Sequence, residues 1–295
     1  MTYCGVVSIA GRPNVGKSTL LNRLIGQKLS ITAHKPQTTR HSILGIHTGD
    51  EHQVIYVDTP GIHVTGTHKL NQVLNRTASS ALHDVDVVVL LVQAMVWNDD
   101  DQRAFDLVSN SGVPFFMAIN KIDTIKHKKD LLPFLTTIPR HERLREVFLV
   151  SARKGAGIDA LTDAVQELIP EAPWRYGEDE LTDRSSRFLA AEAVREQLTR
   201  LLSAELPYAL SVEIETFEES ADLLRIGAVI WVDKNSQKSI VIGKGGSQLK
   251  EVGARARSTL ETLFGNKVYL QLWVRVKAGW ADDERALRSL GYESP

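Results

Sequence analysis

Residues 11–18 read GRPNVGKS, which has the spacing G-x-x-x-x-G-K-S of a phosphate-binding loop. An apolar run at residues 6–10 predicts a short buried strand before this loop, and residues 19–25 predict the first turns of a helix after it. Between a strand and a helix, such a loop directs backbone N–H groups and the positive end of the helix at phosphate oxygens. Lys17 can then reach the β- and γ-phosphates of a nucleotide, and the Ser18 hydroxyl can ligate Mg²⁺.

The composition limits the classes of protein to which the chain can belong. Its 295 residues are 43% hydrophobic and 24% charged, with a formal net charge of −1. These values are typical of a folded protein of about two domains, in which any nucleic-acid surface must be local. The one cysteine, Cys4, excludes an internal disulfide and suits a reducing compartment. Because the longest apolar run, residues 85–92, is too short to cross a bilayer and the first strand begins too early for a signal peptide, we expect a cytoplasmic protein.

A second motif, DTPG, occupies residues 58–61 and follows an apolar strand predicted at residues 53–57. Residues 41–47 predict the partner strand, joined to it by a hairpin at residues 49–50. An acidic residue at the end of a buried strand beside a phosphate-binding loop can hold Mg²⁺ through a water, and the N–H of Gly61 can contact a γ-phosphate. D-x-x-G alone is usually a turn, so its place after the loop and the strand gives it specificity.

The base of the nucleotide is indicated by NKID at residues 120–123, at the end of an apolar strand predicted at residues 114–119. The Asp123 carboxylate can accept hydrogen bonds from N1–H and the 2-amino group of guanine, whereas adenine would leave this carboxylate unpaired at a high cost. The Lys121 stem can lie over the base, and Asn120 can tie this loop to the phosphate-binding loop. The sequence therefore predicts a site for guanine.

Residues 147–150 predict the last strand of this region, and SAR follows it at residues 151–153. The backbone N–H of Ala152 would there meet O6 of guanine. Helical apolar spacing occurs at residues 102–108 and 158–169, after the strands that precede them. This alternation predicts an α/β domain with a mostly parallel sheet and helices on both faces.

The motifs GRPNVGKS, DTPG, NKID and SAR, in this order and spacing, resemble the guanine-nucleotide-binding domain of translation-factor-type GTPases. QTTR at residues 37–40 resembles the switch-one motif of the bacterial branch that contains Era and MnmE-like proteins. The resemblance implies that one of the two threonines senses the γ-phosphate and ligates Mg²⁺, with Thr39 favoured over Thr38.

The resemblance also implies which residues form the site. Ser18, Thr39 and Asp58 would ligate Mg²⁺, and Lys17, Thr39 and Gly61 would act on the γ-phosphate during hydrolysis. The residues expected to bind GTP or GDP are Gly11, Asn14, Val15, Gly16, Lys17, Ser18, Thr19, Asp58, Thr59, Pro60, Gly61, Asn120, Lys121, Asp123, Ser151, Ala152 and Arg153.

One position departs from the pattern of Ras-like enzymes, in which a glutamine after D-x-x-G orients the attacking water. Here Ile62 follows Gly61, so the chain resembles GTPases with a hydrophobic residue at that place, and slow intrinsic hydrolysis is expected. Asn14 resembles the asparagine that holds K⁺ in several relatives, which makes K⁺ a candidate second cofactor.

A change of composition divides the chain. Residues 170–180, PEAPWRYGEDE, carry two prolines, a glycine and acidic residues, which are typical of a linker. We predict a GTPase domain at residues 1–170, a linker at 171–185, a second domain at 186–281 and a tail at 282–295.

The second domain has the predicted order helix–strand–strand–helix–strand, and VIGKGG at residues 241–246 precedes its second helix. A G-x-x-G turn at a helix start lets the backbone approach a single strand of about four nucleotides. The basic residues of this region cluster around GKGG, with Trp280 as a stacking edge for bases and Trp231 and Trp273 as packing residues. The predicted RNA-binding residues are Ile242, Gly243, Lys244, Gly245, Gly246, Lys250, Arg255, Lys277 and Trp280.

This second pattern resembles the bacterial, type II variant of the KH domain, an α+β RNA-binding fold. A P-loop GTPase followed by a KH domain resembles the Era family over essentially the whole chain. The resemblance implies a Mg²⁺-dependent GTPase that acts as a switch in ribosome assembly. Its partners would be the 3′ end of small-subunit ribosomal RNA and the immature small subunit. A monomer is expected, in the cytoplasm or peripherally on the inner membrane.

Two other functions stay open on the sequence. The chain could be an RNA-binding chaperone whose nucleotide site only stabilises the fold, in which case replacing Lys17 would leave function intact. It could also be a P-loop ATPase or kinase, which NKID disfavours.

Overall fold

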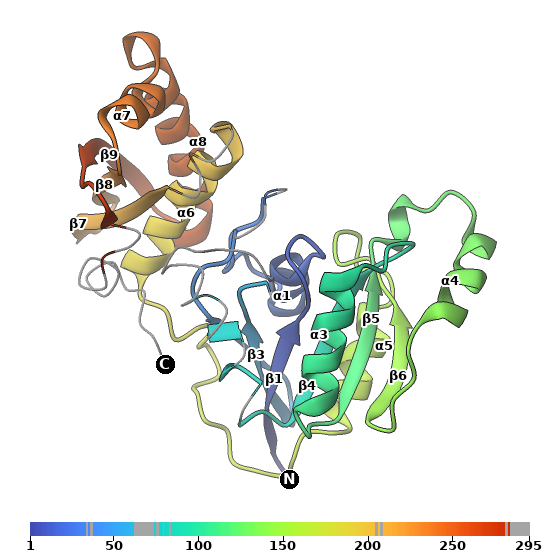
Figure 1. Ribbon diagram of the computed structural model, residues 1–295. Coiled ribbons are helices and arrows are strands. Elements are labelled where there is room, and N and C mark those ends of the chain that lie inside the picture. Colours follow the sequence, from blue (N-terminus) through green and yellow to red (C-terminus); the bar gives the residue numbers. More distant parts are fainter. Residues whose placement is uncertain are drawn as a thin grey trace.

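The computed structural model describes residues 1–33, 35, 38–61, 74, 77–78, 80–82, 84–203, 206, 209–280 and 283. The described chain forms two units, each built on its own sheet (Figure 1). Within these ranges, no helix has the length and apolar character needed to cross a bilayer.

The first unit contains a six-stranded sheet in the order β2-β3-β1-β4-β5-β6. Only the β2–β3 pair is antiparallel, and the other strand pairs of this sheet are parallel, as the sequence predicts. The strands are β1 (Tyr3–Ala10), β2 (Ile43–Thr48), β3 (His52–Asp58), β4 (Val87–Gln93), β5 (Phe115–Asn120) and β6 (Leu144–Leu149). The helices are α1 (Lys17–Ile25), α3 (Asp99–Asn110), α4 (Leu131–Thr137) and α5 (Ile158–Gln166).

Both faces of this sheet are covered, because its central strands are apolar on both sides. In β4, Val87 and Val89 belong to the core that α1 and α5 cover, whereas Val88 and Leu90 belong to the core that α3 and α4 cover. Successive side chains of a strand point to opposite faces, so a continuous apolar run suits a sheet buried between two helical layers. The predicted mostly parallel sheet with helices on both faces is confirmed.

The topology brings the motifs of the sequence to one edge of the sheet. Parallel strands β1, β3 and β5 end at the phosphate-binding loop, at Asp58 and at Asn120, respectively. In open α/β sheets, ligands bind outside these carboxyl ends. The segment after β5 includes two short 3₁₀ helices, η1 (Ile122–Thr124) and η2 (Lys128–Asp130).

The linker is tied to the first unit by its backbone. The Gln53 carboxamide accepts hydrogen bonds from the N–H groups of Arg175 and Tyr176, at 2.8 and 3.0 Å, and donates to the carbonyl of Tyr176 at 2.9 Å. The N–H of Ala172 donates to the carbonyl of Thr2 at 3.1 Å. The linker therefore passes the N-terminal ends of β1 and β3 before the chain enters the second unit.

The second unit is a three-stranded sheet, β7-β8-β9, in which β7 pairs antiparallel and β9 parallel with the central strand β8. Its helices cover one face, where alternate residues of β8 such as Ala228, Ile230 and Val232 are buried. The elements are α6 (Ser186–Leu201), β7 (Leu210–Ser220), β8 (Leu223–Val232), α7 (Asn235–Ile242), the 3₁₀ turn η4 (Lys244–Gly246), α8 (Ser247–Phe264) and β9 (Lys267–Val276).

The structure contains one helix, α7, that is missing from the predicted order helix–strand–strand–helix–strand. The run of β-branched residues before GKGG is helical, although such residues favour strands. Val241 is fully buried in the core that α6, α8 and the sheet share, so tertiary packing overrides local propensity here. Two helices therefore flank the glycine turn.

Candidate functional site

The phosphate-binding loop has the curled backbone that its glycines predict. Gly11 and Gly16 have φ angles of 143° and 109°, and Asn14 lies in the left-handed region at 64°. A Cβ atom at Gly16 would lie 2.4 Å from the Asn120 amide nitrogen, so this position has no room for a side chain. The Lys17 ammonium lies inside the loop and donates to the carbonyls of Gly11 and Arg12, both at 3.0 Å.

Lys17 is buried, and this burial lowers the pKa of its ammonium to about 8, against an opposing effect of the nearby Asp58 carboxylate. A buried cation is costly unless an anion accompanies it. The loop therefore contains a cation placed to be neutralised by a negatively charged ligand.

This pKa gives a pH prediction for the nucleotide-free protein. Between pH 8 and 10 the folded state releases the Lys17 proton while the unfolded state, with a pKa of 10.5, retains it, so the free energy of unfolding should rise by about 2 kcal/mol from this group. Urea unfolding of the wild type and of Lys17→Met at both pH values measures the difference between their slopes. Equal pH dependence of the two proteins would contradict the burial of a charged Lys17.

Three hydroxyl groups meet the Asp58 carboxylate. Its Oδ2 atom accepts hydrogen bonds from Ser18 and Ser30, at 2.7 and 2.8 Å, and from Thr39 at 3.4 Å. The Ser18 and Thr39 hydroxyl oxygens are 2.7 Å apart. Thr38 instead donates to the carbonyl of Lys35 at 2.6 Å. The structure thus brings Thr39, and not Thr38, to Ser18 and Asp58.

The other oxygen of this carboxylate, Oδ1 of Asp58, is buried and has no hydrogen-bond partner among the described residues. Burial raises the pKa of Asp58, and the hydroxyls and Lys17 act in the opposite direction. An unpaired buried carboxylate oxygen beside two hydroxyls is the set of hard oxygen donors that suits Mg²⁺. The residues present therefore fit the ion.

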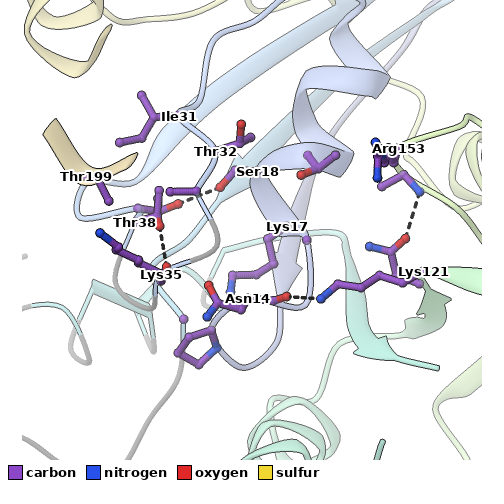
Figure 2. Close-up of a pocket in the computed structure, with 18 of the residues that line it drawn as sticks. Asn14, Lys17, Ser18, Ile31, Thr32, Lys35, Thr38, Lys121, Arg153 and Thr199 are labelled. Carbon is purple, nitrogen blue, oxygen red and sulfur yellow. Dashed lines mark hydrogen bonds between the residues drawn. The ribbon is translucent and has the colours of Figure 1, made fainter. Parts of the chain in front are cut away.

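The end of the site that is predicted to take the base is held together by Asn120 and Lys121. The Asn120 amide donates to the carbonyl of Val15 at 2.8 Å, which confirms the predicted tie to the phosphate-binding loop. The Lys121 ammonium donates to the carbonyl of Asn14 at 2.7 Å (Figure 2). It also donates to the side chain of Gln93 at 2.8 Å. These bonds fix the position of the NKID turn relative to the loop.

The backbone N–H of Ala152, which the sequence analysis assigns to O6 of guanine, has a protein partner in this structure. It donates to Oδ1 of Asn120 at 2.9 Å, because the turn after β6 packs directly on the NKID turn. The same turn places the Ser151 hydroxyl 2.7 Å from Oδ1 of Asp123. This region therefore orients Asn120 and the Asp123 carboxylate.

The predicted residues surround a cavity of about 840 Å³, drawn in Figure 2. Those that line it are Asn14, Gly16, Lys17, Ser18, Thr19, Thr39, Gly61, Asn120, Lys121, Asp123, Ala152 and Arg153. Its lining also includes Thr38, the alternative to Thr39 in the sequence analysis, and residues that the sequence did not indicate: Pro13, Ile31, Thr32, Ala33, Lys35, Thr124, Thr199 and Arg200. Half of the latter lie in a polar loop without periodicity, and two lie on α6 of the second unit.

The other predicted nucleotide-binding residues lie just behind this lining. The Thr59 hydroxyl donates to the carbonyl of Ile9 at 3.1 Å, and Val15 is fully buried in the core. A Cβ atom at Gly61 would lie 2.7 Å from the backbone nitrogen of Pro13, so the DTPG turn contacts the phosphate-binding loop closely. Pro60 is buried, Gly11 accepts from Lys17, and Ser151 bonds Asp123. The inferences on Gln37 and Ile62 fall outside the described residues.

In the second unit, three glycines give the GKGG turn its shape. Gly243, Gly245 and Gly246 have φ angles of 74°, 60° and 79°. A Cβ atom at Gly243 would lie 2.7 Å from Cβ of Gln248, whereas one at Gly245 would have no described atom within 4 Å outside its chain neighbours. Lys244 and Lys250 are exposed. The turn thus presents open backbone at the N-terminus of α8.

Three of the predicted RNA-binding residues have side chains that contact other protein groups away from the GKGG turn. Arg255 forms an ion pair with Glu251 at 2.6 Å on α8, and the Lys277 ammonium lies 5.9 Å from the ring centre of Trp231. Trp280 is 1% exposed, and its indole N–H donates to the carbonyl of Ala209 at 3.3 Å. The prediction of Trp280 as a stacking edge is therefore wrong, because the chain after β9 turns this ring into the domain. Trp273, expected as a packing residue, is 41% exposed.

Two family models match separate parts of the chain. Residues 6–121 match the family of 50S ribosome-binding GTPases, and residues 205–281 match the KH domain.

Whole-chain relatives show the same combination. The chain is 53% identical over 291 residues to GTPase Era of Stenotrophomonas maltophilia, covering 99% of this chain and 98% of that protein. It is also 53% identical over 289 residues to GTPase Era of Xanthomonas axonopodis, with 98% and 97% covered. A solved structure of Era with MgGDPNP and nucleotides 1506–1542 of 16S ribosomal RNA superposes with a TM-score of 0.94 at 38% identity, covering 99% of both chains. An Aquifex aeolicus Era variant bound to GDP·AlF₄⁻ gives the same values. The chain belongs to the Era family of GTPases.

Proposed function

We propose that the protein binds GTP and GDP with Mg²⁺, hydrolyses GTP slowly, and binds the 3′ end of small-subunit ribosomal RNA while the small subunit is assembled. The observation that carries this proposal is the cavity in which Lys17, Ser18, Thr39 and Asp123 meet. Its support from relatives is the Era structure with MgGDPNP and 16S ribosomal RNA, and the Era variant with GDP·AlF₄⁻.

Each group of the site has a role in this proposal. Ser18, Thr39 and Asp58 hold Mg²⁺, which would neutralise charge on the β- and γ-phosphate oxygens. Lys17 exchanges its two carbonyl partners for phosphate oxygens, and Asp123 accepts the two N–H groups of guanine. The N–H of Gly61 and the hydroxyl of Thr39 contact the γ-phosphate. Hydrolysis removes the γ-phosphate, so the segments that carry Gly61 and Thr39 can then be released.

The second unit supplies the RNA site. The backbone of Gly243 to Gly246 approaches the RNA strand, and the exposed ammonium groups of Lys244 and Lys250 contact its phosphates. The local basic charge explains how a chain with a net charge of −1 can bind RNA.

Three finer properties belong to the same proposal. Asn14 holds K⁺, so hydrolysis should be faster in K⁺ than in Na⁺ buffer, and equal rates would remove this role.

The protein is a monomer in the cytoplasm that associates peripherally with the inner membrane. Fractionation of cells, followed by a high-salt wash of the membranes, tests this location.

The proposed function is tested by measuring GTP hydrolysis with and without a short single-stranded RNA that matches the 3′ end of small-subunit ribosomal RNA. We expect slow turnover that this RNA increases. Turnover that is indifferent to the RNA would mean that the two units work independently. A protein that binds neither GTP nor GDP would contradict the nucleotide assignment.

Replacing Gly245 tests the RNA site at a position where a side chain has free space. Gly245→Asp places a carboxylate where a Cβ has free space, so we expect RNA affinity to fall by about tenfold or more through repulsion of phosphates. Gly245→Asn is the matched control, because asparagine has the same shape, tolerates a positive φ and carries no charge. Binding titrations at two salt concentrations measure both variants. Equal affinities for the two variants would place the RNA elsewhere.

A further inference from the structure

Helix α6 of the second unit forms part of the wall of the nucleotide cavity. Thr199 and Arg200, from its last turn, line the same cavity as Lys17 and Asp123. Figure 2 shows Thr199 on the side of the cavity where Ile31 and Thr38 lie, and α6 lies on the side of its unit that faces the first unit (Figure 1). The nucleotide site is therefore built from both units.

Polar groups of α6 bind the backbone of the switch segment, which we define as residues 31–33, 35 and 38–40. Glu196 accepts from the N–H of Thr32 at 2.9 Å, and Arg200 donates to the carbonyl of Thr32 at 3.0 Å. Arg195 donates to the carbonyl of Thr38 at 2.5 Å. The helix thus holds the segment at two points, on either side of its middle.

Two of these three contacts are made by buried charges. Glu196 is 0% exposed and Arg195 is 2% exposed. Arg195 pairs with the buried Glu192 at 2.6 Å, and Glu196 pairs with Lys28 and Arg200. A buried ion pair is weak evidence for stability, because desolvation of the charges offsets their attraction. These ion pairs are better explained by their effect on position, because they hold the side chains of Arg195 and Glu196 against the backbone of the switch segment.

The opposite side of α6 belongs to the core of the second unit. Val194 and Leu198 are fully buried there, together with residues of the sheet and of α8. A displacement of the second unit must therefore move Arg195 and Glu196 with it. The backbone partner of Arg195, Thr38, immediately precedes Thr39, whose hydroxyl lies 2.7 Å from that of Ser18. The contacts connect the RNA-binding unit to the residue proposed to hold Mg²⁺.

We infer that Arg195 and Glu196 are positioning residues of the nucleotide site, which hold the switch segment so that Thr39 lies beside Ser18 and Asp58. This inference rests on the proposed GTPase function. On this inference, the KH unit and Thr39 change position together. A ligand that stabilises the observed position of the KH unit then also stabilises Thr39 beside Ser18, and the reverse holds.

The test compares affinities for GDP and for the non-hydrolysable analogue GDPNP, because the γ-phosphate is the group that depends on Thr39. In Arg195→Met we expect GDPNP affinity and kcat to fall about tenfold, with GDP affinity within about twofold of the wild type. Arg195→Lys should restore part of the loss, since it keeps a donor. The double variant Glu192→Gln, Arg195→Met removes both buried charges and guards against unfolding caused by an unpaired carboxylate.

Glu196→Gln keeps an acceptor for the N–H of Thr32 and should lose less than Arg195→Met. Arg187→Met is the matched control, because Arg187 is an exposed residue of α6 that donates to Ile214 within the second unit. The inference is overturned if Arg195→Met and the double variant keep the wild-type GDPNP-to-GDP affinity ratio and kcat. It is also overturned if both affinities fall equally. Failure of the wild type to bind GTP would instead overturn the proposed function.

Discussion

Asp123→Asn is expected to weaken GTP binding by about 10⁴-fold and to allow xanthosine triphosphate to bind in its place. A carboxylate accepts hydrogen bonds at both oxygens, as the N1–H and 2-amino groups of guanine require. An asparagine amide would direct its NH₂ group at the 2-amino group, so two donors would face each other. Xanthine carries a carbonyl at that position, which accepts from the amide.

The surroundings of Asp123 make this effect large. Ser151 donates to one of its oxygens at 2.7 Å, and Lys121 and Asn120 fix the turn that carries it. A carboxylate held in this way cannot rotate freely to suit another base. The expected loss therefore reflects unpaired groups in a fixed site and not a change of the fold.

Competition binding with GTP and xanthosine triphosphate measures the change of preference. Asp130→Asn, at an exposed aspartate in η2, removes the same charge on the same unit and should leave both affinities unchanged. Retention of GTP affinity in Asp123→Asn would contradict the assignment of this carboxylate to the base.

The sequence predicted the nucleotide motifs because each one combines a spacing with a place at the end of a strand. Asp58 and Asn120 end parallel strands, and the parallel order of the sheet then requires them to be close to the phosphate-binding loop. The preference for Thr39 over Thr38 came from resemblance, and the structure brings Thr39 to Ser18. Local pattern and topology together were sufficient to predict that Asp58 and Asn120 lie beside the phosphate-binding loop.

Features that depend on contacts between distant segments were not predictable. Arg195 and Glu196 read as an ordinary polar face of a helix, because nothing in their spacing reveals that this face is buried against the switch segment. The burial of Trp280 depends on the path of the chain after β9, and helix α7 depends on the packing of Val241. In each case tertiary packing gave a structure different from the one that the local sequence pattern predicts.

Lys17→Met is expected to lower GTP hydrolysis by about 100-fold or more, since it removes a preorganised positive charge from the γ-phosphate. Other cations line the cavity, but three of them are already engaged. Lys35 donates to the carbonyl of Leu202, Lys121 to that of Asn14 and Arg200 to that of Thr32. None of these three can replace Lys17 without breaking a contact that shapes the site.

The same variant separates a GTPase switch from an RNA-binding chaperone whose nucleotide site only stabilises the fold. The proposed RNA site on α7, η4 and α8 lies in the other unit, so RNA affinity of the nucleotide-free protein should stay within about twofold of the wild type. Hydrolysis is followed by phosphate release, and function by the support of small-subunit assembly in cells depleted of the wild type. Lys154→Met, at an exposed lysine of the first unit, is the control. If Lys17→Met binds RNA and still supports assembly, hydrolysis is dispensable; if it binds RNA and fails, the nucleotide cycle is what the RNA-bound protein needs.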